Sequence, residues 1–152
     1  MVVKRIENGT VIDHIPGGAA PLVLKILGIR FGTEEKIIVA INVESDQLGV
    51  RDVVKIVGRK LREDEVNKIA LVAPDATVNI ISRFRVTGKK KVAPPQKIIG
   101  LMKCLRPTCI TNSADGRDVA PVIELVSKNP LLYRCFFCEQ PIEQSQIEGC
   151  LS

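Results

Sequence analysis

Alternating polar and apolar residues predict the first strand of the chain, over residues 10–15. The even-numbered positions, among them Ile12 and His14, fall on one face of this strand. The odd-numbered positions, among them Val11 and Asp13, fall on the other face. A proline and two glycines follow, and they end the strand in a turn.

Apolar residues at helical spacing predict two helices. The first begins near Pro21 and ends at Gly28, because proline is tolerated at the start of a helix and glycine commonly follows its end. The second begins with the acidic run 63–65, whose negative charge suits the N-terminus of a helix. Its apolar stripe extends from Val66 to Ala73.

Three further segments rich in β-branched residues predict strands at 36–43, 52–57 and 77–86, the last of them bent or split near Ser82. The order is strand, helix, strand, strand, helix, strand. This order predicts an α+β fold in which two helices cover one face of a mainly antiparallel sheet.

A change of composition marks the expected domain boundary. The lysine run 88–91 and the prolines that follow it resemble a semi-stiff spacer. We therefore expect an N-terminal domain at 1–92, a linker at 93–99 and a second domain at 100–152. Expected strands at 98–102, 119–126 and 131–136 make this second domain small and all-β.

Four cysteines carry the clearest chemistry, in the pattern C-x4-C, twenty-five residues, C-x2-C. Two such pairs can surround one tetrahedral Zn(II) ion with thiolates and leave no open coordination position, which predicts a structural metal. The alternatives are two disulfides or free buried thiols. The four residues are Cys104, Cys109, Cys135 and Cys138, and Cys150 lies outside the pattern as a plain thiol.

The charge of the chain is uneven. Residues 1–92 hold 16 basic and 11 acidic residues, whereas residues 93–152 hold 6 of each. The zinc lobe is therefore neutral and poorly suited to grip a phosphate backbone, and the chain has no Trp and one Tyr to stack on bases. A small anion is a better partner for the basic lobe than a nucleic acid.

Membrane and catalytic functions find little support in the sequence. No apolar run approaches twenty residues and no charged-then-apolar leader precedes the fold, so we expect a soluble, cytoplasmic protein without a membrane partner. His14 is the only histidine, and no phosphate loop or catalytic triad pattern is present. A non-catalytic protein is the better hypothesis.

Several polar residues of the first lobe have both an ordinary and a functional interpretation. Asp13 and His14 can be satisfied rim residues, or they can bind the polar head of a small ligand. Lys55, Lys89 and Arg5 can be solvated surface cations, or they can converge on a multiply charged anion such as a triphosphate. Their spacing in the sequence leaves both interpretations open.

Three motifs give the chain a resemblance to a known family. The stretches GTVIDHIP (9–16) and LVAPDATVN (71–79), together with the cysteine tetrad, resemble the aspartate carbamoyltransferase regulatory chain over nearly the whole length. This resemblance implies a non-catalytic subunit with a nucleotide-binding allosteric domain and a zinc domain that grips the catalytic chain. It also implies pairing of two regulatory chains through their allosteric domains.

The resemblance implies CTP and ATP as effectors and one structural zinc ion per chain. The base and ribose would meet Asp13, Lys55 and the backbone near Ile6, and the triphosphate would meet Lys89 beside His14. Arg5 departs from the family, whose members carry a small residue there, so its phosphate contact is our own interpretation. The full effector set is Arg5, Ile6, Asp13, His14, Lys55, Asn79, Ile81, Val86 and Lys89.

Other departures from the family pattern concern the same region. Arg51 replaces a lysine, Phe84 replaces a tyrosine, and the N-terminal segment is several residues shorter. Three rival functions remain at this point: a zinc-ribbon protein that binds nucleic acid, a small zinc enzyme, and a scaffold whose nucleotide pocket no longer works. The metal with four thiolate ligands argues against the enzyme, and the neutral zinc lobe argues against the nucleic-acid binder.

Overall fold

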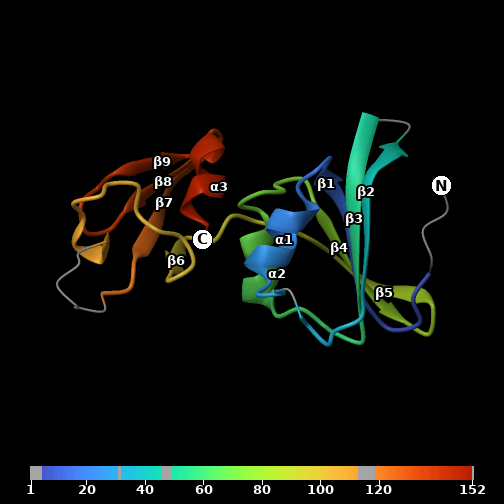
Figure 1. Ribbon diagram of the computed structural model, residues 1–152. Helices are drawn as coiled ribbons and strands as arrows, with labels where there is room; N and C mark the ends of the chain where they lie inside the picture. The colour runs from blue at the N-terminus through green and yellow to red at the C-terminus, as the bar shows by residue number, and fades with distance from the viewer. Residues whose placement is uncertain (1–4, 31, 46–48, 113–118, 152) are drawn as a thin grey trace. The chain divides into compact units, whose positions relative to one another are not determined.

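The structure is a computed structural model that describes residues 5–30, 32–45, 49–112 and 119–151. The chain divides into two compact units, an N-terminal unit (1–93) and a C-terminal unit (94–152). Each unit has its own sheet, whose elements are labelled in Figure 1. Within the described ranges, none of the helices is long and apolar enough to cross a membrane.

The N-terminal unit is a five-stranded antiparallel sheet with two helices on one face (Figure 1). The strand order is β2-β3-β1-β4-β5, so the first strand lies at the centre. This arrangement confirms the predicted α+β class. The elements are β1 (Gly9–Pro16), α1 (Ala20–Ile26), β2 (Ile37–Ser45), β3 (Gly49–Val57), α2 (Glu63–Ile69), β4 (Thr77–Ser82) and β5 (Arg85–Lys91).

The core of this unit lies between the helices and the sheet. It is formed by apolar residues of β1, β3 and β4 that face α1 and α2, among them Ile12, Val54, Val78, Val23 and Ile69. All five are at most 1% exposed. Burying side chains of this size stabilises the fold by about 1.5–3 kcal/mol each, which fixes the face of the sheet that the helices cover.

A bulge in β1 keeps two isoleucines in this core. Ile12 pairs with Val54, but the next paired residue is Ile15, opposite Asp52, so two residues of β1 are displaced between them. His14 lies in the bulge and takes a φ of 60°, which is uncommon for a residue other than glycine. Ile12 and Ile15 are both fully buried as a result.

Asp52 is a fully buried carboxylate that ties α1 to β2. It accepts hydrogen bonds from the backbone N–H of Ala20, at the start of α1, and of Asn42, each at 2.8 Å. Asn42 has a φ of 58° and lies where β2 shifts its register against β3. A short sheet-covering helix and a bulged edge strand are therefore held by one side chain.

The segment predicted as one strand at 77–86 consists of two strands joined by a tight turn. Arg83 and Phe84 take φ angles of 51° and 64°, which are typical of a two-residue hairpin turn. The predicted split near Ser82 is thus confirmed. Such turns usually contain Asn and Gly, so the residue types Arg and Phe gave no turn signal.

The lysine run predicted as part of a spacer lies in β5. Thr77, Val78 and Asn79 of β4 pair with residues 91, 90 and 89, respectively. The run therefore continues the edge of the sheet, and the prediction of a spacer at 88–91 is wrong. Lysines on an edge strand discourage pairing with another chain, which accounts for their place there.

The C-terminal unit is a small antiparallel sheet in the order β6-β7-β8-β9. Its strands are β6 (Lys97–Ile99), β7 (Val122–Lys128), β8 (Leu131–Cys135) and β9 (Pro141–Glu143). Residues 97–99, expected within the linker, thus belong to this sheet. Strand β9 and the one-turn helix α3 (Ile147–Cys150) are not predicted from periodicity, since both are very short.

Leu151, the last described residue, is tied to the segment that leads into the first cysteine pair. Leu151 forms an isolated bridge with Met102, and the carbonyl of Cys150 accepts a hydrogen bond from Lys103 N–H at 2.9 Å. Cys150 is fully buried, and burial raises the pKa of its thiol. This cysteine therefore acts as a small core residue.

Candidate functional site

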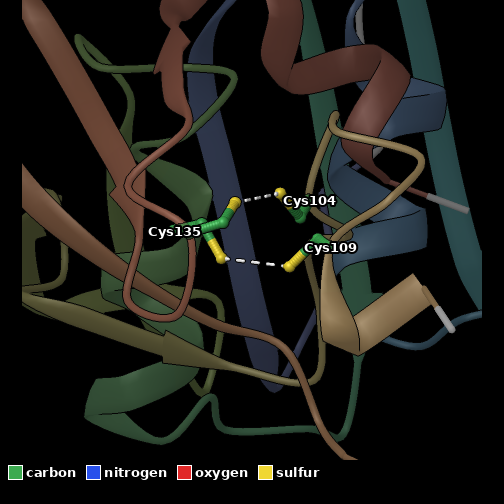
Figure 2. Close-up of side chains that lie close together, drawn as sticks. Cys104, Cys109 and Cys135 are labelled. Carbon is green, nitrogen blue, oxygen red and sulfur yellow. Dashed lines mark hydrogen bonds between the residues drawn. The ribbon is translucent and has the colours of Figure 1, made fainter.

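The four cysteines of the predicted tetrad come together in the C-terminal unit. Their sulfur atoms all lie within 4.8 Å of one another. Sγ of Cys104 is 3.4 Å from Sγ of Cys138, and Sγ of Cys109 is 3.7 Å from Sγ of Cys135. Figure 2 shows the thiols of Cys104 and Cys109, on one loop, facing that of Cys135 at the end of β8.

These distances fit a shared metal and not a disulfide. Four sulfurs around one tetrahedral ion, with metal–sulfur bonds of about 2.3 Å, lie about 3.8 Å apart. A disulfide needs a sulfur–sulfur distance of about 2.05 Å. None of the five cysteines, all within the described residues, forms a disulfide. The disulfide alternative is therefore excluded in this structure, and the donor set fits a metal that accepts four thiolates.

The loop that carries Cys104 and Cys109 is held by an amide side chain. Asn112, at the end of the 3-10 turn η1 (Ile110–Asn112), donates through Nδ2 to the carbonyls of Cys104 and Arg106, at 2.9 Å each. Arg106 in turn donates to Oε1 of Gln140, just beyond the second cysteine pair, at 3.2–3.3 Å. These contacts hold the two cysteine loops together before any metal is considered.

Hydrogen bonds to the sulfurs favour thiolates at part of the cluster. The hydroxyl of Thr111 donates to Sγ of Cys109 at 3.2 Å. Burial acts to raise the pKa of Cys109, but the hydrogen bonds from the Thr111 side chain and backbone outweigh it and lower this pKa to about 7. Burial raises the pKa of Cys104 and of Cys135. A cation among the four sulfurs would offset that burial.

The polar residues predicted in the N-terminal unit lie on the sheet face opposite the helices. One row of directly paired residues crosses all five strands through Lys55 of β3, Asn79 of β4 and Lys89 of β5. Directly paired residues project from the same face of a sheet. The row is Ile38, Lys55, Val11, Asn79 and Lys89.

The neighbouring row on this face is apolar. Val57, Gly9, Ile81 and Val86 pair in sequence across β3, β1, β4 and β5. Val86 is 60% exposed, which is high for valine in a sheet. We call the two rows together the open face. Five of its nine members belong to the predicted effector set. Ile38 and Val57 do not, because the register that aligns them is not visible in any single strand.

Lys55 is the unusual member of the open face. It is only 8% exposed, although lysine is seldom buried. Its pKa is lowered by burial first and by the positive charge of Arg5 second, and the negative charge of Asp13 partly offsets this. Arg5 and Lys55 therefore form a region of positive charge at one end of the row, and Lys89 lies three strand spacings, or about 14 Å, from Lys55.

Asp13 forms a short polar cluster beside the row. Its Oδ1 lies 3.0 Å from Nε of Arg51 and accepts the N–H of His14 at 2.7 Å. The His14 ring contacts the hydroxyl of Thr77 through Nδ1 at 3.0 Å. Thr77 pairs directly with Asp13 across β1 and β4. Asp13, Arg51 and His14 thus lie together near the C-terminal end of β1.

Arg5 and Ile6 line a hollow at the other end of the sheet. This hollow has a volume of about 270 Å³ and is bordered by Arg5, Ile6, Glu7, Lys36, Ile38, Val57 and Phe84. Arg5 donates to the carbonyl of Phe84 at 2.8 Å. His14 lines a separate hollow of about 260 Å³ with Arg51 and Asp75. The predicted set therefore extends over the whole face and does not gather at one point.

Comparisons with known proteins agree with this division of the chain. Residues 1–93 match the family model described as the aspartate carbamoyltransferase regulatory chain, allosteric domain. Residues 96–148 match the model for the metal binding domain of the same regulatory chain. The two models together cover nearly the whole sequence.

Similar full-length proteins carry the same description. An aspartate carbamoyltransferase regulatory chain of Methanopyrus kandleri is 49% identical over 145 residues, covering 95% of this chain and 92% of the relative. That of Korarchaeum cryptofilum is 45% identical over 152 residues, covering 100% and 96%. That of Thermococcus sibiricus is 47% identical, covering 95% and 93%. The chain therefore belongs to the aspartate carbamoyltransferase regulatory chain family, as a non-catalytic subunit with an allosteric and a metal-binding domain.

Proposed function

We propose that this chain binds nucleoside triphosphates of the CTP and ATP type on the open face and conveys their presence to a catalytic chain held by the C-terminal unit. The observation that carries the proposal is the row joining buried Lys55 to Lys89 through Asn79. Two cations separated by about 14 Å suit an elongated anion better than a single phosphate.

The effector roles follow from the chemistry of each part of the face. Exposed Lys89 suits the triphosphate. Arg5 and Lys55 suit the base and ribose end, where the 270 Å³ hollow combines apolar with charged lining residues. The charge of Arg5 first suggested a phosphate contact. Because Arg5 lies in the hollow beside Phe84, we propose instead that it contacts the base and ribose end. Asp13 contacts Arg51 and the N–H of His14 through Oδ1, and because a carboxylate has several acceptor sites it can also accept a ribose hydroxyl.

For the C-terminal unit we propose one structural zinc ion per chain. The four thiol sulfurs at tetrahedral spacing support this assignment, and softness of the ligands favours zinc over Mg²⁺ or Ca²⁺. Zinc would hold the two cysteine loops together with no position open for substrate. The unit has a small core, so metal binding would supply much of its folding free energy.

The surface around the metal suits contact with the catalytic chain. Phe136 and Phe137, between the second pair of cysteines, are 56% and 42% exposed and pack edge to face, with ring centroids 5.1 Å apart. Ile110, directly after Cys109, is 46% exposed. We call these three residues the knuckle patch. Exposed aromatic anchors on a rigid, metal-held loop are typical of a protein interface.

The outer edge of β2 suits pairing with a second regulatory chain. Val39, Ile41 and Val50 of β2 and β3 are 38%, 48% and 47% exposed. β5, the opposite edge, carries lysines and arginine instead. An apolar edge strand favours association and a cationic one opposes it, so we propose that two chains pair along β2.

Nucleotide affinity tests the open face. Lys89→Ala and Lys55→Met each remove a charge-assisted hydrogen bond, so each should weaken CTP and ATP binding by roughly 1.5–3 kcal/mol, or more than tenfold. Lys89→Ala should affect triphosphates more than nucleosides, whereas Lys55→Met should affect both alike. Lys90→Ala is the matched control, because Lys90 pairs with core-facing Val78. Isothermal titration calorimetry measures all three.

The pH dependence follows from the lowered pKa of Lys55. Protonated Lys55 is the form that attracts an anion. Nucleotide affinity should therefore be full below this lowered pKa and fall as pH rises through it, before the ordinary lysine value of 10.5 is reached. Lys55→Met should lack this fall. Parental affinity in both lysine variants would show that the effector site lies elsewhere.

Metal content tests the tetrad. Cys109→Ala or Cys138→Ala should lose the zinc and unfold the C-terminal unit, while the N-terminal unit stays folded on its own core. Cys150→Ala is the control and should retain one zinc per chain, since Cys150 is outside the cluster. Elemental analysis and amide hydrogen exchange give the two readouts. Full zinc content in Cys138→Ala would rule out the ligand assignment.

Binding to the catalytic chain tests the knuckle patch. Phe136→Asp should weaken this binding by about 2–4 kcal/mol, because it places a charge where an aromatic anchor would be buried. Ile99→Asp, at an apolar residue that is 63% exposed on β6, is the control and should have little effect. Zinc content should be unchanged in both. Equal losses of affinity would mean that the patch is not the interface.

Sedimentation tests the proposed pairing of two chains. Ile41→Glu should convert a dimer of the isolated chain into a monomer, because it places a charge on the apolar edge. Val86→Glu, an equally polar change on the open face, should remain dimeric. A dimer that persists in Ile41→Glu would show that the chains pair through another surface.

A further inference from the structure

The connector between the two units is anchored at its N-terminal end by β5. Lys91, the last residue of β5, pairs with Thr77. Val92 is partly buried and packs against the apolar core of the N-terminal unit. The chain is thus part of the N-terminal unit up to Val92, and Ala93 is the first exposed residue after it.

At its C-terminal end the connector is held by Tyr133, the only tyrosine of the sequence. Tyr133 is fully buried in β8, between Leu125 of β7 and Ile142 of β9. Its hydroxyl donates to the carbonyl of Pro95 at 2.8 Å, across 38 positions of sequence. The hydroxyl is the donor in this pair, because a backbone carbonyl oxygen can only accept.

A second hydrogen bond continues this attachment. The N–H of Leu125 donates to the carbonyl of Gln96 at 2.9 Å, and β6 begins at Lys97. Pro94 and Pro95 have fixed φ angles, and each proline also restricts the residue before it. Ala93 and Pro94 lie between Val92, which packs in the first unit, and Pro95, whose carbonyl binds Tyr133, and the two prolines leave their backbone few conformations.

We infer that Tyr133 is a positioning residue that confines the pivot between the two units to Ala93 and Pro94, and that coupling from nucleotide to catalytic chain depends on this short joint. The inference rests on the proposed function. A long flexible linker would let one unit change its orientation without constraining the other. A two-residue joint with a proline is stiffer, so a change in the direction of the chain at the end of the first unit is transmitted to the second. Tyr133 contacts neither the cysteine cluster nor the open face by any described interaction.

Tyr133→Phe tests the inference in the complete complex with the catalytic chains. The change removes one hydroxyl and keeps the buried ring. CTP or ATP changes the half-saturating aspartate concentration of the complex by some factor. In Tyr133→Phe the logarithm of this factor should be less than about half of its value in the parent. CTP affinity, zinc content and binding of the catalytic chain should stay within about twofold of the parent. Amide exchange at Leu125, whose N–H donates to the carbonyl of Gln96, should accelerate about fivefold or more.

Two further variants separate positioning from general stability. Gln146→Ala removes another side-chain hydrogen bond of the C-terminal unit, to Glu143 N–H at 2.8 Å, and should keep the nucleotide effect. Insertion of Gly-Ser between Ala93 and Pro94 lengthens the joint without altering Tyr133, and it should reduce the effect as Tyr133→Phe does.

The inference would be overturned by a full nucleotide effect in Tyr133→Phe, by a full effect in the insertion variant, or by an equal loss in Gln146→Ala. Loss of zinc in Tyr133→Phe would also overturn it, because the role of the residue would then be structural. Failure of the proposed function is distinct, since the parental complex itself would then show no nucleotide effect.

Discussion

The register of β1 against β3 and β4 is the constraint on which the N-terminal unit depends. A one-residue slip of β1 would exchange its two faces, sending Val11 toward the helices and Ile12 to the surface. In a regular strand Ile12 and Ile15 would face opposite sides of the sheet. The bulge between them keeps both isoleucines buried and leaves Asp13 beside the open face. Core packing thus determines where Lys55, Asn79 and Lys89 lie.

The two units obtain their stability in different ways. The N-terminal unit buries a continuous apolar layer. The stabilisation from this burial can offset the free-energy cost of burying Lys55 near Arg5. A cation in such a place is unfavourable for folding and favourable for binding an anion, which is typical of functional sites. The C-terminal unit has a smaller core around Tyr133, and its two cysteine loops are joined by polar contacts of Asn112 and Arg106 and, in the proposed function, by a bound metal ion.

Periodicity and spacing predicted the parts of this fold that single segments encode. The alternation around Val11 predicted β1, the acidic run predicted the start of α2, and the C-x4-C and C-x2-C pairs predicted the cysteine cluster. Features that depend on pairing between distant segments were not predictable. The lysines of 89–91 were assigned to a spacer because charge suggests solvation, but an edge strand also tolerates it. Asp52 looked like an ordinary strand residue, and only the fold shows it joining α1 to β2. The Tyr133–Pro95 contact crosses 38 positions and left no local signal.

The central claim is that the open face and the catalytic chain are thermodynamically coupled, and reciprocity tests it most directly. Binding free energies of two coupled ligands must change by the same amount in either direction. The measurement is the CTP dissociation constant of the complete complex, by calorimetry, with and without a saturating inert substrate analogue on the catalytic chains. The account predicts that the constant changes by the same factor by which CTP changes the affinity for the analogue, typically about 5–150-fold. An identical CTP dissociation constant in both conditions, with the analogue shown to be bound, would contradict the account.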